Sequence, residues 1–140
     1  MIAYLDSSVL LRVVLRQPDA LEEWEEIETG VASALVEVEC LRTLDRLRLG
    51  GGITDRQLAS RRAAVLEIVE ALEVVEPTRP VLARASQPFP TSLGTLDAIH
   101  FATALLWRDA MAKDLVMATH DGGLARAARS LGMRVVGSSE

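Results

Sequence analysis

Four acidic side chains lie at the ends of apolar segments or inside them, where an isolated carboxylate is costly to bury. Asp6 follows the apolar run at residues 2–5, and Asp121 follows the run at residues 115–119. Glu39 lies within residues 34–41, and Asp97 opens the apolar segment at residues 97–106. Carboxylates in such places stay ionised when they are paired or bound to a cation. If the four converge, they would suit a hard divalent metal ion and metal-assisted phosphodiester chemistry.

Three of these acids also have a purely local interpretation. Asp6, before Ser7-Ser8, could be a helix N-cap, and Asp121, before Gly122-Gly123, could be another. Asp97 could simply complement the positive end of its helix. The joint placement of the four acids favours the functional interpretation.

The apolar periodicity predicts alternating strands and helices along the chain. Strands are expected at residues 2–5, 31–32, 74–75, 115–118 and 134–136. Helices are expected at residues 8–16, 18–28, 34–49, 54–72, 78–85, 95–112 and 124–131, with a capping box at Thr54–Gln57 and a loop at residues 87–94. Such alternation predicts an α/β fold with a mainly parallel central sheet and helices on both faces.

This fold would bring the four acids to one edge of the sheet. Asp6 and Asp121 each come just after a predicted strand, and Glu39 and Asp97 lie in the first turns of predicted helices. In open α/β sheets, ligands bind beyond the carboxyl ends of the strands, where the strand order reverses. Because the four carboxylates would repel one another there, we expect an Mg²⁺ or Mn²⁺ ion between them.

The size and composition predict one globular domain over residues 1–140. No apolar stretch is long enough to span a membrane, and Asp6 and Arg12 interrupt the N-terminal region where a secretory signal would need an apolar core. The lone cysteine, Cys40, excludes an internal disulfide, which fits the cytoplasm, and it is expected to be a small core residue.

The net charge of −5 is concentrated in one segment. Residues 19–28 hold six acids and no base, and the rest of the chain has 14 acids and 15 bases. Arginines gather at positions 42, 46, 48, 56, 61 and 62. They could hold phosphates or form an ordinary exposed helix surface. Any binding to nucleic acid is therefore expected to be local rather than a broad electrostatic attraction.

Four segments of the chain together resemble the motifs of PIN domains. They are Tyr4–Leu10, Ser33–Arg42, Leu96–Ala104 and Ala118–Asp121, the last followed by Leu124–Ala128. The chain is most similar to the VapC-type ribonuclease toxins of type II toxin–antitoxin pairs. The resemblance implies a three-layer α/β/α nuclease that cuts RNA with Mg²⁺ or Mn²⁺. It also implies a homodimer that a cognate antitoxin holds inactive by blocking the acidic crevice.

The resemblance also assigns roles to individual residues. Asp6 and Asp97 match the principal metal ligands of the family, and Asp121 matches a further acid near the end of the chain. Ser8 and Thr119 match hydroxyl positions that support the carboxylates.

The fourth acid is less easily chosen, because Glu37 and Glu39 are two residues apart. Helical periodicity does not choose between them, but the family's spacing from Ser33 selects Glu39 as the fourth catalytic acid. His100 is expected to be a packed, hydrogen-bonded residue rather than a general base. His120 lies where the family varies, so no role follows for it.

Two other functions compete with the ribonuclease. One is a PIN-like module that has lost catalysis and serves only in binding or assembly. The other is an aspartyl-phosphate phosphatase with Asp6 as its nucleophile. Such phosphatases resemble Asp-x-Asp after the first strand, and this chain has Ser8 at the second position.

Overall fold

The computed structural model describes residues 1–139, in which five parallel strands form one sheet. The strands are β1 (Ile2–Leu5), β2 (Thr29–Ser33), β3 (Glu73–Val75), β4 (Val116–Ala118) and β5 (Val135–Val136). Their order is β3-β2-β1-β4-β5, so the order reverses between β1 and β4. Each neighbouring pair is parallel. The predicted fold class is confirmed, and all five predicted strands are present.

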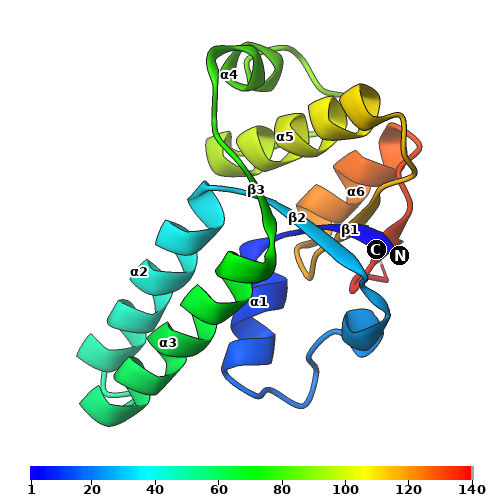
Figure 1. Cartoon of the computed structure of the whole chain (residues 1–140). Helices are drawn as coiled ribbons and strands as arrows, with labels where there is room; N and C mark the ends of the chain where they lie inside the picture. Colours follow the sequence, from blue (N-terminus) through cyan, green and yellow to red (C-terminus); the bar gives the residue numbers. More distant parts are fainter. Residues whose placement is uncertain (140) are drawn as a thin grey trace.

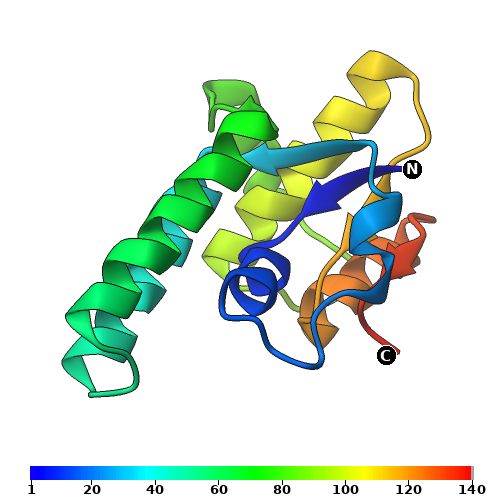
Figure 2. The ribbon, with the colours of Figure 1, turned by 60° about the horizontal axis from the view of Figure 1, so that its bottom comes forward.

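Helices cover both faces of the sheet, which gives the expected three layers (Figure 1). On one face lie α1 (Ser7–Val14), α2 (Leu35–Leu49) and α3 (Asp55–Ala71). On the other lie α5 (Thr95–Met111) and α6 (Gly122–Ser130), with α4 (Arg79–Ala85) packed on α5. The α2–α3 pair extends well beyond the sheet in two views (Figures 1 and 2).

The central strand β1 is buried on both of its faces. Ala3 and Leu5 pack into the core formed with α1, α2 and α3, whereas Tyr4 packs into the core formed with α5 and α6. Successive side chains of a strand point to opposite faces, so a strand covered on both sides needs a continuous apolar run. This is why residues 2–5 are apolar without alternation.

The predicted helix at residues 18–28 is wrong. The segment forms only a short 3-10 helix, η1 (Glu22–Glu26), before β2. Leu21 is buried, and Trp24 and Ile27 are partly buried against the same core. A 3-10 helix has three residues per turn, so side chains spaced three residues apart lie on one face of it. An α-helix would spread them over a wider arc.

The turn between α2 and α3 follows the local sequence closely. Gly51 has a φ of +79°, a conformation that a glycine adopts without a steric penalty. The predicted capping box is confirmed, because the Gln57 backbone N–H donates to Thr54 and the Gln57 side chain accepts from the Thr54 backbone N–H. These local signals begin α3 where the sequence predicts.

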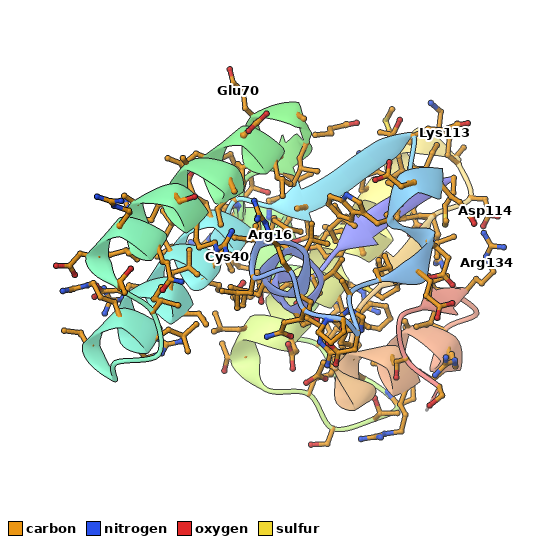
Figure 3. All side chains as sticks on the ribbon, turned by 90° about the horizontal axis from the view of Figure 1, so that it is seen from below. Arg16, Cys40, Glu70, Lys113, Asp114 and Arg134 are labelled. Atoms are coloured by element: carbon orange, nitrogen blue, oxygen red, sulfur yellow. The ribbon has the colours of Figure 1, made fainter. Side chains whose placement is uncertain are left out.

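Cys40 is buried, as expected, and its thiol lies 3.9 Å from the carbonyl oxygen of Ser7. Figure 3 shows it inside the molecule between α2 and α1, whereas Glu70 of α3 points outward. Burial is the main cause that raises the pKa of the Cys40 thiol to about 12, so the residue serves packing. Within residues 1–139, no helix is long and apolar enough to cross a membrane.

Candidate active site

Asp6 lies just beyond the carboxyl end of β1, beside the point where the strand order reverses. Its backbone N–H donates to the carbonyl of Ala118 at the end of β4, at 3.1 Å. Asp6 occupies the N-cap position of α1, but its side chain makes no capping hydrogen bond. The interpretation of Asp6 as a helix cap therefore fails. The residue is nevertheless buried, with only 5% of its surface exposed.

Two hydroxyls hold the carboxylate of Asp6 instead. Ser8 Oγ donates to Asp6 Oδ2 at 2.7 Å, and Thr119 Oγ1 donates to the same oxygen at 2.9 Å. Each hydroxyl also accepts a backbone N–H, Ser8 from His120 at 3.0 Å and Thr119 from Asp121 at 3.0 Å. Because each hydroxyl proton is directed at Asp6 by this second bond, the carboxylate is fixed in one orientation.

Asp121 has a structural role that can be seen directly. Its Oδ1 accepts the backbone N–H of Leu124 at 2.8 Å and caps α6. The local interpretation of this residue is thus correct. A carboxylate has two oxygens and several lone pairs, so capping through Oδ1 does not prevent Oδ2 from binding a ligand.

Asp97 lies in the first turn of α5, and the charges of the other three acids act on it. Burial raises the pKa of Asp97 to about 6, and the charges of Asp121, Asp6 and Glu39 add to this effect. The charge of His100 acts in the opposite direction. The structure thus brings the four acids into one electrostatic neighbourhood at the carboxyl edge of the sheet.

Glu39 projects from α2 and bonds to His100 of α5. His100 Nε2 and Glu39 Oε1 are in direct hydrogen-bond contact, and the Glu39 side chain is 21% exposed. Burial alone would lower the pKa of His100, but the bond to Glu39 and the charges of Glu39, Asp6 and Asp97 outweigh it and raise that pKa. His100 is packed and hydrogen-bonded, as the sequence predicts, but its link to Glu39 has no signature in the sequence.

The two remaining candidates, Glu37 and His120, lie close to the site in sequence. Glu37 is partly exposed in the first turn of α2, and Glu39 is the glutamate whose charge acts on Asp97. The ring of His120 contacts the segment after β5, because its Nδ1 lies 2.8 Å from the carbonyl oxygen of Gly137.

A cleft of about 330 Å³ opens beside Glu39. The side chains of α2 form most of it, and Ser7 and Leu96 complete its lining. Arg42 and Arg46 lie on this cleft, and Arg48 does not line it. Arg42 and Arg48 both pair with Asp45, at 3.0 and 2.8 Å. Of the arginine cluster noted in the sequence, Arg42 and Arg46 are therefore the members placed next to an acid of the candidate site.

The donor set fits a hard divalent cation. All four acids present oxygen ligands, and the charges of Asp121, Asp6 and Glu39 add to burial in raising the pKa of Asp97. Within residues 1–139, no three acidic, histidine or cysteine side chains are placed to hold one ion by themselves. A metal site here would therefore use one or two of these carboxylates together with bound waters, a coordination that Mg²⁺ often has in proteins.

The PIN domain family matches residues 3–130. The chain belongs to the PIN domain family. It is 34% identical over 140 residues to Ribonuclease VapC46 of Mycobacterium tuberculosis, with 97% of each chain covered. The similarity to VapC ribonucleases that the sequence motifs indicate is thereby confirmed.

Solved structures show the same PIN-type fold. A toxin–antitoxin complex from Klebsiella pneumoniae contains a chain with a TM-score of 0.66 and 14% identity, with 100% of this chain and 97% of that chain covered. VapBC2 from Rickettsia felis, bound to a DNA fragment from its promoter, gives a TM-score of 0.64 and 12% identity, with coverage of 96% and 97%.

Proposed function

We propose that this PIN-domain protein is a metal-dependent endoribonuclease and the toxin of a toxin–antitoxin pair. The observation that carries the proposal is the orientation of Asp6 by two hydroxyls at an edge where Glu39, Asp97 and Asp121 also gather. The whole-length likeness to a VapC ribonuclease supports the same activity. Its substrate would be RNA, and its reaction the hydrolysis of a phosphodiester bond.

Asp6 and Asp97 would hold the cation, Mg²⁺ or Mn²⁺, and Asp121 would reach it through a coordinated water. When bound, such an ion lowers the pKa of a coordinated water and neutralises charge that develops on the phosphate. Ser8 and Thr119 keep the Asp6 carboxylate in place. Glu39 orients the attacking water, whose oxygen bonds to phosphorus as the bond to the leaving ribose oxygen breaks. Asp121 is less free for this role because it caps α6.

The deciding experiment changes Asp6 to Asn and measures RNA cleavage by purified protein with Mg²⁺ or Mn²⁺. Loss of the negative charge should lower the rate by at least about 100-fold, in line with the cost of losing charge stabilisation in other active sites. EDTA should abolish cleavage by the unchanged protein. Undiminished cleavage by a folded Asp6→Asn variant would contradict the proposal.

Asp114→Asn is a matched control. Asp114 is exposed in the loop before β4, at the opposite end of that strand from Asp121 (Figure 3). The same change in charge and size at this position should leave cleavage unchanged.

EDTA-sensitive cleavage would also exclude the catalytically inactive binding module. The phosphatase alternative is disfavoured because Ser8 supports Asp6 by a hydrogen bond, where the phosphatase motif has a second acid.

The antitoxin, the homodimer and a cytoplasmic location belong to the same proposal. The similar fold in toxin–antitoxin complexes supports the antitoxin partner. Induced expression of this chain alone should arrest growth, and co-expression of a small protein encoded beside its gene should relieve the arrest. Asp6→Asn should be harmless when expressed at the same level. Light scattering of the purified chain at several concentrations tests the dimer.

A further inference from the structure

A chain of buried polar groups crosses the sheet and ends at Glu39. The backbone N–H of Ser33, at the end of β2, donates to the hydroxyl oxygen of Tyr4 at 3.1 Å. That oxygen lies 2.7 Å from His100 Nδ1, and His100 Nε2 contacts Glu39 Oε1. Tyr4 and His100 are both 0% exposed. The chain links β2, β1, α5 and α2, and Figure 1 shows that the first turns of α2 and α5 lie close together.

The hydrogen-bond partners indicate that His100 carries a proton on Nε2. A backbone N–H can only donate, so Ser33 occupies a lone pair of the Tyr4 oxygen. The Tyr4 oxygen keeps a second lone pair, so the hydroxyl can donate to Nδ1 of a neutral imidazole or accept from Nδ1–H of a protonated one, and in both cases Nε2 carries a proton. A neutral imidazole that accepts at Nδ1 carries its own proton on Nε2, and Nε2 faces the Glu39 carboxylate. The opposite tautomer would direct a lone pair at a carboxylate oxygen.

The position of Glu39 distinguishes this chain from ordinary core packing. Glu39 is the member of the chain that reaches the surface, and it lines the cleft that also contains Arg42 and Arg46. The bond to His100 uses Oε1, which leaves Oε2 as the oxygen directed to other ligands. A flexible glutamate is thereby restricted to one rotamer at the edge of the site. Such restriction is how a supporting residue increases the efficiency of a catalytic one.

We propose that His100 is a positioning residue for Glu39, with Tyr4 fixing the imidazole so that its Nε2–H is always directed at the carboxylate. This inference rests on the proposed ribonuclease activity. His100 neither takes the proton of the attacking water nor touches the substrate. It determines which Glu39 oxygen faces the water. Tyr4 holds the imidazole in place through its hydroxyl, which is itself bonded to the backbone of Ser33 at the end of β2.

The first test compares His100→Gln with His100→Leu. The glutamine amide nitrogen can replace Nε2 as a donor to Glu39, whereas leucine fills similar space and donates nothing. We expect His100→Leu to lower kcat about 10- to 100-fold, the usual cost of losing a supporting hydrogen bond, with little change in KM. His100→Gln should recover most of the loss. Equal losses in two folded variants would overturn the proposal.

Trp107→Phe is the matched control for the loss of a partly buried side-chain hydrogen bond on α5. Trp107 lies on the same helix, and its Nε1–H donates to Glu73 at 2.9 Å, well away from Glu39 in the fold. The variant should lose stability but keep its activity. If Trp107→Phe lowered kcat as much as His100→Leu, the effect on activity would be one of general destabilisation and the proposal would fail.

The second test needs no activity. ¹⁵N NMR of histidine-labelled protein should show His100 Nε2 protonated, with its proton shifted downfield by the bond to the carboxylate. Glu39→Ala should remove that shift, and Tyr4→Phe should weaken the preference for the Nε2–H tautomer. An unprotonated Nε2, or a spectrum that Glu39→Ala does not change, would overturn the proposal. If the unchanged protein cuts no RNA, the proposed function fails while this spectrum still decides the role of His100.

Discussion

Asp97 lies where its charge is disfavoured, because it is partly buried and other acids surround it. A carboxyl group with a pKa of about 6 in the folded protein and 3.8 as its ordinary value stabilises the fold only while it is protonated. That contribution is complete below pH 3.8 and is lost as the pH rises through about 6. Asp97 therefore makes the metal-free protein less stable as the pH rises over this interval.

This leads to a pH-dependent prediction for Asp97→Asn. In EDTA at pH 7.5, the variant should be more stable than the unchanged protein by about 1 kcal/mol, a figure reduced for solvent screening of a partly exposed group. The difference should disappear below about pH 4. Thermal unfolding across this range measures it. A variant that is less stable at pH 7.5 without metal would contradict the prediction.

The hydroxyls of Ser8 and Thr119 show that the hydrogen bonds of such a site cannot be predicted from single residues in the sequence. Each donates to Asp6 and accepts from the β4–α6 connection. In the sequence they are 111 positions apart, and only the family resemblance connects them. The local rule for Ser and Asp before a helix predicts a cap, and this rule is correct for Asp121 but not for Asp6.

At the scale of elements, α2 carries both Glu39 and the arginines of the adjacent cleft. Arg42 is also paired with Asp45, whereas Arg46 bonds to Thr43 and is exposed. An arginine one or two turns from a catalytic acid can contact the phosphates that flank the cleaved bond. This makes Arg46 the better candidate for binding the RNA backbone.

We expect Arg46→Ala to raise KM for RNA several-fold, with kcat little changed. The slope of log binding constant against log salt concentration should become shallower by about 1, as for the loss of one phosphate contact. Binding measured at several salt concentrations checks this. Arg62→Ala is the control, because Arg62 is exposed on α3 and does not line the cleft. Equal effects of the two changes would mean that the basic surface of the helix pair acts as a whole.

The acidic segment shows why element type can differ from the prediction. Pro18 and the acids after it are typical of a helix start, but the buried side chains repeat at intervals of three residues. Packing against the core therefore selects a 3-10 turn. Elsewhere the apolar pattern was sufficient, since β1 and α5 are buried on most sides and need nearly continuous apolar sequence.

At the scale of the whole molecule, charge is separated across the fold. The acidic segment around η1 lies on the opposite side of α1 from α2 in two views (Figures 1 and 2). The net charge of −5 therefore does not describe the surface beside Glu39, where Arg42 and Arg46 lie. A strand of RNA can approach this side without meeting the acidic segment directly.

Asp6, Asp97 and Asp121 come from the end of β1, from α5 and from the N-cap of α6, so one cation would connect three elements. Binding to the folded state alone stabilises it by about 2.7 kcal/mol when the ion is at 100 times its Kd. We expect saturating Mn²⁺ to raise the Tm of the unchanged protein by several degrees and that of Asp6→Asn by much less. Differential scanning fluorimetry at pH 7.5 tests this, with Asp114→Asn as the control. Equal shifts in all three proteins would place the metal elsewhere.

The sequence by itself determined the alternation of strands and helices and the parallel sheet, because apolar periodicity and local capping residues specify elements directly. The four acids stay a prediction, and for Glu39 that prediction rests on the resemblance to PIN domains. Only the tertiary structure decided that Asp6 is bonded to both Ser8 and Thr119, and that Glu39 is bonded to His100. Hydrogen bonds between residues distant along the chain leave no periodic pattern. They form only after the strands have aligned and brought those side chains together.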